Sequence, residues 1–219
     1  VHYLQGNYEE AVKKYNQSMK IEEELGDKSG IAGTLHQLGM FHQDQGNYEE
    51  AVKKYNQSLK MKEELGDKSG IATTLHELGN VHYLQGNYEE AVKKYNQSMK
   101  IEEELGDKSG IAGTLHQLGM FHQDQGNYEE AVKKYNQSLK MNEELGDKSG
   151  IATTLHQIGI INEENRECSS ALRNYLISYS IFEQLNSPNK EIVARSLLRL
   201  RDKMGEEEFD AEFEKLVNE

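Results

Sequence analysis

Apolar and polar residues alternate along this chain with the periodicity of an α-helix, in segments of similar length separated by short turns. In the segment after Asn47, apolar and small residues recur at spacings of three and four, with pairs of lysines and glutamates on the opposite side. Asn47 and Glu50 have the spacing of a capping box, which favours the start of a helix. Gly66 follows at the position where a left-handed backbone needs glycine. The sequence therefore predicts a helix over 48–65, which we call helix B.

A second helix, which we call helix A, is predicted directly after this turn. Asp67 is placed to cap it, one apolar side continues as far as His82, and Gly86 ends the segment. Because the turns are so short, the two helices must be antiparallel neighbours. Glycine inside a helix costs about 1 kcal/mol relative to alanine. We therefore interpret Gly79, which recurs in every copy, as a point of close approach between its helix and the helix that carries Ala91.

This pattern recurs at a fixed period, in copies that begin at Gly6, Gly46, Gly86 and Gly126. Such a period is typical of a solenoid in which each unit buries its apolar face against the next. The expected fold is all-α, a single α-solenoid domain over 1–219 built from antiparallel helix A and helix B hairpins, with about five repeats and a C-terminal capping helix. The predicted segments are the end of a truncated helix A at 1–5, near-identical units at 6–45, 46–85, 86–125 and 126–165, a divergent unit at 166–205 and the capping helix at 206–219.

The segments 1–80 and 81–160 are almost the same. They differ only at the positions of Lys62, Glu77, Leu78 and Asn80 in the first segment. The repeats thus alternate in an ABAB pattern, which indicates recent duplication of a block of two units in a natural protein.

Composition narrows the functional classes. The net charge of −13 argues against binding to nucleic acid or to an anionic membrane surface. A single cysteine, Cys168, excludes an internal disulfide framework and fits a reducing, cytoplasmic location. No apolar run approaches the roughly 18–20 residues of a membrane span. The sequence holds no phosphate-binding loop, catalytic triad or metal motif, so we expect neither enzymatic activity nor a cofactor.

Histidines recur at two positions of helix A, and we expect a different role for each position. His36 and its copies invite a metal-site interpretation. However, neighbouring helices pack about 8–10 Å apart whereas a metal–ligand bond is about 2 Å long. These histidines are instead expected to be polar surface residues that titrate near pH 6.5, so that partner binding changes across pH 5.5–7.5. His42, His82 and His122 are expected to be buried packing residues with one ring nitrogen hydrogen-bonded.

The acidic stretches 22–24 and 102–104 are interpreted as solvated surface. A calcium site is disfavoured because neither a loop glycine nor an alternating Asp/Asn pattern accompanies them.

The small and aromatic positions resemble the tetratricopeptide repeat. That family has a large apolar residue, then Leu-Gly and an aromatic residue on helix A, followed by small and aromatic residues on helix B. The unit here is longer than the family's usual repeat of about 34 residues. It also lacks the usual proline, and in both respects it is similar to the LGN family of adaptors and, more loosely, to kinesin light chains. The matching residues in one unit are Leu75, Leu78, Gly79, His82, Gly86, Tyr88, Ala91, Tyr95 and Ser98.

The resemblance implies a right-handed superhelix whose concave groove is lined by the A helices and binds a peptide or protein segment. The partner would carry apolar anchors and neutral-to-basic charge. Two alternatives stay open: end-to-end self-assembly through an uncapped N-terminal repeat, with homo-oligomers, or the regulatory repeat arm of a larger protein. Carried over position by position, the groove residues are His36, Met40, Gln43, Asp44, Thr73, His76, Asn80, Tyr83, Leu84, His116, Met120, Gln123, Asp124, His156 and Ile160, with Gly33, Gly113, Thr153, Glu163 and Glu164 beside them. The amide of Asn80 is expected to bind the backbone of a bound peptide.

Overall fold

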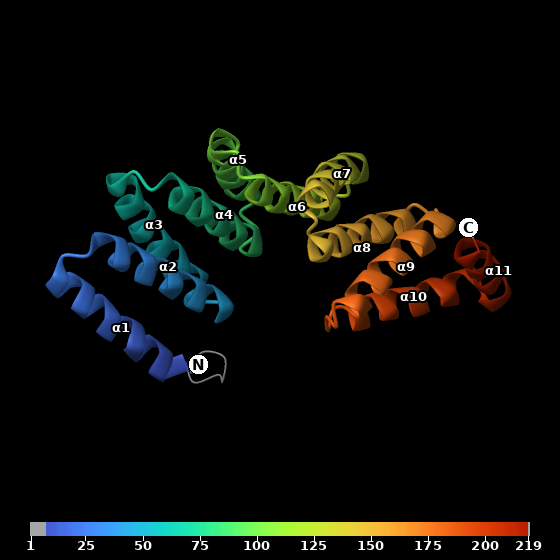
Figure 1. Ribbon diagram of the computed structural model, residues 1–219, viewed down its shortest axis with the longest axis horizontal. Helices are drawn as coiled ribbons and strands as arrows, with labels where there is room; N and C mark the ends of the chain where they lie inside the picture. Colours follow the sequence, from blue (N-terminus) through green and yellow to red (C-terminus); the bar gives the residue numbers. More distant parts are fainter. Residues whose placement is uncertain (1–7, 219) are drawn as a thin grey trace. The chain divides into compact units, whose positions relative to one another are not determined.

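The computed structural model describes residues 8–218, and the regular structure within that range is α-helical throughout (Figure 1). This confirms the all-α prediction; the segment 1–5 lies outside the described residues. Helices of type B are α1 (Tyr8–Leu25), α3 (Tyr48–Leu65), α5 (Tyr88–Leu105), α7 (Tyr128–Leu145) and α9 (Cys168–Gln184). Helices of type A are α2 (Lys28–Asp44), α4 (Lys68–Leu84), α6 (Lys108–Asp124), α8 (Lys148–Glu164) and α10 (Lys190–Met204), and α11 (Glu206–Val217) follows them.

The chain divides into two compact units, residues 1–110 and residues 111–219. Unit 1 holds α1–α5 and the first turn of α6, and unit 2 holds the rest of α6 and α7–α11. Each unit is a stack of antiparallel helical hairpins, which confirms the α-solenoid architecture. The assignment of 1–219 to a single domain and the handedness of its superhelix stay predictions.

The turn between helix B and helix A is built as the sequence predicts. Gly66 adopts a left-handed conformation with φ of 70°. The backbone N–H of Asp67 donates to the carbonyl oxygen of Lys62 at 2.9 Å, which satisfies an otherwise free carbonyl at the end of α3. The Asp67 side chain then accepts the backbone N–H of Gly70 at 2.9 Å and so caps α4.

The other turn differs from the predicted capping box. The side chain of Asn47 makes no capping hydrogen bond, and Glu50 pairs with Lys53 at 3.2 Å instead. The backbone holds this turn, because the N–H of Asn47 donates to the carbonyl oxygen of His42 at 2.8 Å across the left-handed Gly46. The predicted side-chain cap at Asn47 is therefore wrong, although the predicted start of the helix is right.

Each unit has its core between the A and B helices. In unit 1, Ala51, Tyr55 and Leu78 are completely buried, and Ile101 of α5 packs against the same cluster. The core thus continues from one hairpin into the next, as expected for a solenoid. In unit 2, Phe209 of α11 packs against the cluster around Leu172, so α11 covers part of the apolar end of this unit, as predicted for a capping helix.

Candidate interaction surface

The glycine of each A helix lies against the ring of a buried tyrosine on the following B helix. A Cβ atom added to Gly79 would come within 2.6 Å of the Tyr95 ring. The glycine therefore makes room for an aromatic side chain, whereas the sequence predicted a direct approach of two helix backbones near Ala91. The same arrangement recurs in the pairs Gly39–Tyr55, Gly119–Tyr135 and Gly159–Tyr175.

The hydroxyl of each buried tyrosine finds an acceptor on the preceding A helix. Tyr55 donates to Oε1 of Gln43 at 2.9 Å, and Tyr135 donates to Gln123 at 2.8 Å. In the repeat between them the corresponding residue is Tyr83, which lacks an amide. There, the acceptor moves to another position of the same helix.

Asn80 supplies that acceptor. Its Oδ1 accepts the hydroxyl of Tyr95 at 2.7 Å, and its Nδ2 donates to Glu77 at 3.1 Å. Both ends of the amide are thus engaged inside unit 1, which leaves one N–H and one lone pair of the amide, and its binding to a peptide backbone stays a prediction. The signal was present in the sequence, because the asparagine appears in the one near-identical repeat that has Tyr83 in place of glutamine.

The histidines in the predicted groove connect neighbouring A helices. Nδ1 of His36 lies 3.3 Å from the Thr74 hydroxyl on α4, and the ring of His36 packs on that of Tyr55 with centroids 5.2 Å apart. In unit 2, His116 makes the same contact with Thr154 at 3.3 Å. The A helices therefore lie side by side within each unit.

Burial changes how these histidines titrate. Burial, with a smaller contribution from the charge of Lys62, lowers the pKa of His36 to about 4. Burial alone lowers the pKa of His116 to about 4 as well, and the pKa of His156 is lowered by burial and by Arg199. The expectation that these rings titrate near pH 6.5 is therefore wrong, whereas the change of partner binding across pH 5.5–7.5 stays a prediction.

The second set of histidines is only partly as expected. His42, His82 and His122 are half-buried, and Nδ1 of each is enclosed without a hydrogen-bond partner. Burial lowers the pKa of all three. Each ring packs as the sequence predicts, and His82 makes the predicted single hydrogen bond, with Gln85.

One acidic residue is buried where solvated surface was predicted. Glu102 is 3% exposed and accepts the Ser98 hydroxyl at 2.8 Å, while Glu103 and Glu104 are exposed. At the same repeat position Lys62 is also buried, and it donates to Thr74 at 2.9 Å. Helical rotation explains the difference, since this position faces the A helix and its neighbours face solvent.

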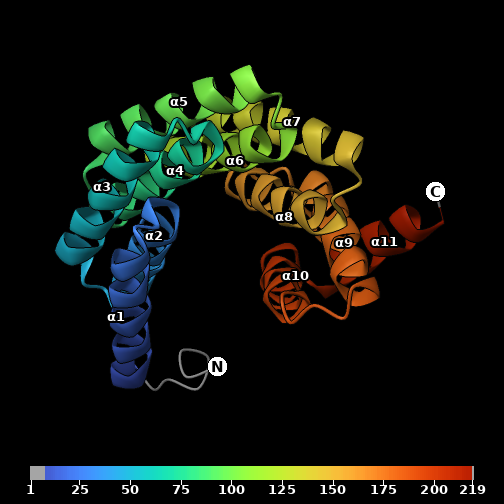
Figure 2. The same ribbon diagram turned by 60° about the vertical axis from the view of Figure 1, so that its left-hand side comes forward.

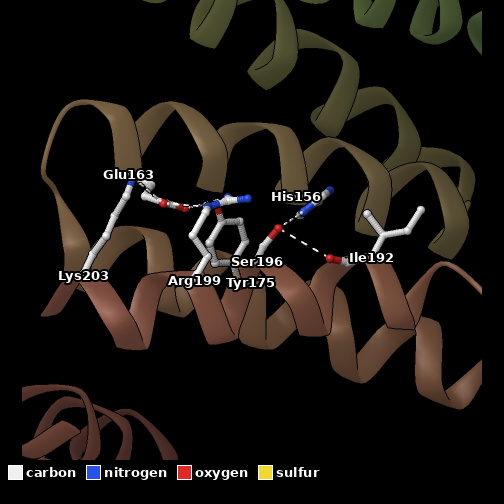
Figure 3. Close-up of polar contacts among 7 residues, drawn as sticks. All are labelled: His156, Glu163, Tyr175, Ile192, Ser196, Arg199 and Lys203. Atoms are coloured by element: carbon white, nitrogen blue, oxygen red, sulfur yellow. Dashed lines mark hydrogen bonds and ion pairs between the residues drawn. The ribbon is translucent and has the colours of Figure 1, made fainter. Parts of the chain in front are cut away.

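Sequence reasoning missed a charged cluster in unit 2 (Figure 3). The side chain of Glu163, 1% exposed, accepts two hydrogen bonds from Arg199 at 2.8 and 2.9 Å, pairs with Lys203 at 2.6 Å and accepts the Tyr175 hydroxyl at 2.8 Å. The hydrogen bonds, led by those of Arg199, lower the pKa of Glu163 to about 2. Beside this cluster, His156 lies 2.9 Å from the Ser196 hydroxyl. α8, α9 and α10 are thereby joined by one polar network.

The remaining predicted groove residues differ in how much surface they offer. Met40 is 40% exposed and Leu84 is 51% exposed, whereas Met120 and Ile160 are half-buried and pack against the core clusters of unit 2. Exposed residues of the set are Gly33, Asp44, Thr73, Gly113, Asp124 and Glu164, and half-buried ones are Gln43, His76, Tyr83, His116, Gln123, Thr153 and His156.

Within residues 8–218, no group of three or more His, Cys, Asp or Glu side chains is placed to hold a metal ion. In the same range, no helix is both long and apolar enough to cross a membrane. Cys168 is half-buried and packs against the core of unit 2.

Comparison with known proteins identifies the repeat. The family model described as tetratricopeptide repeat matches residues 30–104 and 110–184. No curated protein matches the chain. Among solved structures, BtubC (BKLC) from P. vanneervenii is similar with a TM-score of 0.74 and 17% identity, over 84% of this chain and 77% of that one.

Two further structures share the fold. The apo form of RapI is similar with a TM-score of 0.72 and 18% identity, over 91% of this chain and 58% of RapI. A Podosopora anserina kinesin light chain protein with nearly identical TPR-like repeats is similar with a TM-score of 0.64 and 20% identity, over 84% of this chain and 91% of that one. At these identities the likeness establishes the fold alone.

Proposed function

Because the chain belongs to the tetratricopeptide repeat family, whose fold generally serves as a protein-interaction scaffold, we propose that it binds a peptide or protein segment along the exposed side of its A helices. The observation that carries this proposal is the surface formed by α2 and α4 in unit 1, which we call the α2–α4 face. It combines exposed apolar side chains, Met40 and Leu84, with the exposed carboxylate of Asp44.

The composition of the α2–α4 face indicates what it binds. His36 is buried, and Gln43 and Asn80 are engaged by tyrosine hydroxyls, so these polar residues shape the face from below. The surface above them is mostly apolar, with Met40, Leu84 and the half-exposed ring of Tyr83. A segment with apolar anchors and basic residues complements such a surface, since apolar contacts supply affinity and opposite charge favours orientation.

The experiment uses a matched pair of exposed leucines in unit 1. Leu84 is 51% exposed at the end of α4, and Leu65 is 44% exposed at the end of the B helix α3. Peptides selected from a random display library against the full chain are titrated against Leu84→Glu and Leu65→Glu. We expect Leu84→Glu to weaken binding at least about tenfold, because loss of a hot-spot contact costs at least about 2 kcal/mol, and we expect Leu65→Glu to leave binding unchanged.

Met40→Glu provides a second, independent variant on the same face. Selected peptides that bind both Leu84→Glu and Met40→Glu as tightly as the unmodified chain would show that the α2–α4 face is not the binding surface. Failure of the library to yield any specific peptide would also count against the proposal.

A further inference from the structure

The differences between the segments 1–80 and 81–160 converge on α4. Of the four positions that differ, three lie on α4 itself, at Glu77, Leu78 and Asn80. The fourth, Lys62, belongs to α3, but its Nζ donates to the Thr74 hydroxyl of α4 at 2.9 Å. Two otherwise identical segments have thus diverged at one of the two helices that form the α2–α4 face.

Glu77 changes the charge of this face. The other three near-identical units have a neutral residue at this position, the glutamines Gln37, Gln117 and Gln157. The Glu77 side chain is half-buried, so part of it is accessible to a partner. Lys62, the other charged difference, is buried beneath the surface.

Two tyrosine hydroxyls locate the Glu77 carboxylate. α4 packs against α3 and α5, the helices that carry Tyr55 and Tyr95 (Figure 1, Figure 2). Burial, followed by the charge of Glu77, raises the pKa of Tyr55, whose hydroxyl is bound to α2 through Gln43. Burial, Tyr83 and Glu77 raise the pKa of Tyr95. A carboxylate within electrostatic reach of both hydroxyls lies on the side of α4 that faces α2.

Among the described residues, no cation balances this carboxylate. Glu77 accepts a hydrogen bond from Asn80 at 3.1 Å, and no lysine or arginine within residues 8–218 pairs with it. Lys62 is directed elsewhere, since it also donates to the carbonyl oxygen of Gly70 at 3.3 Å. Burial lowers the pKa of the adjacent His76, so this ring is neutral at pH 7.

An exposed apolar side chain lies close enough to be contacted together with Glu77. Leu84 follows Glu77 by seven residues, so both lie on the same side of α4, about 10 Å apart along its axis. An extended segment advances about 3.3 Å per residue. About four residues of one bound segment therefore reach from the carboxylate to the leucine.

From these observations we propose that Glu77 selects the segment that binds the α2–α4 face, by pairing with an arginine or a lysine of that segment. This inference rests on the proposed function and adds to it the residue that determines specificity. The basic side chain supplies the cation that the chain does not place beside Glu77, while an apolar side chain of the same segment covers Leu84. Partial burial strengthens such a pair relative to one in bulk water, and an acidic residue at the same place would be repelled.

The corresponding helix of unit 2 lacks this feature. α8 has Gln157 and Ile160 where α4 has Glu77 and Asn80. Glutamine and isoleucine offer no charge to a basic side chain. Glu77 therefore gives unit 1 a selectivity that α8 does not give unit 2, although their repeats are otherwise nearly identical.

Parallel selections from one random peptide library test the inference. The library is displayed against the full chain and against its variant Glu77→Gln. The variant is conservative, because glutamine occupies this position in the other near-identical units and can still accept the hydrogen bond from Asn80. We expect arginine or lysine to recur at one fixed position of the peptides selected by the unmodified chain, and at no fixed position of those selected by Glu77→Gln.

Isothermal titration calorimetry then assigns the contact. In a selected peptide the recurring basic residue is replaced by glutamine. We expect this replacement and Glu77→Gln each to weaken binding at least about tenfold, and the two changes together to cost little more than either alone. Glu63→Gln removes the same charge from the exposed surface of α3 and should leave binding unchanged.

Three results would overturn the inference. They are unchanged binding by Glu77→Gln, additive effects of the two replacements, and an equal loss of binding in Glu63→Gln. If Leu84→Glu weakens binding in any of these cases, the proposed function still stands. If neither Leu84→Glu nor Glu77→Gln weakens binding, or if the library yields no specific peptide, the proposed function fails together with this inference.

Discussion

The α4–α5 hairpin of unit 1 and the α8–α9 hairpin of unit 2 each bury a tyrosine, but they satisfy its hydroxyl in different ways. Tyr95 donates to the neutral amide of Asn80 within the hairpin. Tyr175 donates to the carboxylate of Glu163, which is also held by Arg199 and Lys203 of the next helix, α10. A neutral acceptor keeps the interaction local, whereas a buried carboxylate requires cations and so draws a third helix into the network.

This difference separates the repeated part of the chain from its divergent end. In the near-identical units, each A helix carries its own acceptor for the next tyrosine, so the units are interchangeable. In the last of these units, 126–165, the acceptor is the charged Glu163, which makes α8 and α9 depend on α10 of the divergent unit. We therefore expect perturbations of the divergent end to cost more than the matched perturbations of the repeats.

The largest effect is expected from Arg199→Ala. Removing this cation leaves Lys203 as the one cationic partner of the buried Glu163. Breaking a buried ion pair typically costs about 3–5 kcal/mol, and because the Arg199 side chain is half-exposed we expect the lower value, about 3 kcal/mol. Urea unfolding should show a loss of that size. The double variant Glu163→Gln with Arg199→Ala recreates the neutral acceptor of the repeats, so it should be more stable than Arg199→Ala alone. Equal stabilities of the two variants would contradict the charged-network interpretation.

A pH titration of stability should give the next effect. Because burial lowers the pKa of His36 to about 4, the ring is neutral in the folded chain at pH values where the unfolded chain binds a proton. Its contribution is complete above about pH 6.5 and is lost as pH falls toward 4. At pH 5 we expect this histidine to lower the free energy of unfolding by on the order of 2 kcal/mol relative to pH 7.

The variant His36→Gln serves as the control, since it should lose less stability between pH 7 and pH 5 than the unmodified chain. The same substitution at His156, whose pKa is lowered by burial and by Arg199, tests whether the divergent end behaves alike. An unchanged pH dependence in both variants would show that neither ring is held neutral.

Asn80→Met should have a smaller effect. Methionine is the residue at this position in the neighbouring repeats, as Met40 and Met120. The substitution leaves the Tyr95 hydroxyl without an acceptor, because Tyr83 has no amide to accept it as Gln43 accepts that of Tyr55. An unsatisfied buried hydroxyl costs about 1–2 kcal/mol. Adding Tyr83→Gln restores the arrangement of Gln43 with Tyr55, so the double variant should regain most of the lost stability in thermal unfolding. A double variant as unstable as Asn80→Met would refute the exchange of acceptors.

The smallest effect is expected from Arg166→Gly. Arg166 has φ of 64° at the turn where the earlier units have glycine, and a side chain in this conformation costs about 1 kcal/mol. The substitution should raise the free energy of unfolding by about that amount. Gly126→Arg, the reverse change in a repeated unit, should lower the free energy of unfolding by a similar amount. A loss of stability in Arg166→Gly, or a gain in Gly126→Arg, would contradict backbone strain at Arg166.

Most of the fold could be predicted from the sequence because helix periodicity, Gly66 and Asp67 are local features. The burial and the hydrogen-bond partners of the site residues could not be predicted from the sequence. His36 lies on the predicted side of its helix, but only packing against Tyr55 and Thr74 shows that its ring is buried.

The charged cluster of unit 2 also could not be predicted from local features of the sequence. Arg199 and Lys203 could not be assigned to Glu163, since they lie two helices further along the chain and an insertion near Pro188 shifts the register of the repeat. The change at Asn80 and Tyr83 was the one tertiary feature that comparison of the repeats alone could have revealed.

The position of the tyrosine acceptor has an evolutionary consequence. Gln43 and Asn80 each lie near the end of a repeated segment and serve the tyrosine of the segment that follows. Unequal recombination between such units can therefore lengthen or shorten the gene without leaving a buried tyrosine hydroxyl unpaired. Each unit carries the acceptor for the tyrosine of whichever unit follows it. Asn80 and Tyr83 lie in the same unit, 46–85, so recombination that moves this whole unit keeps the variant arrangement together.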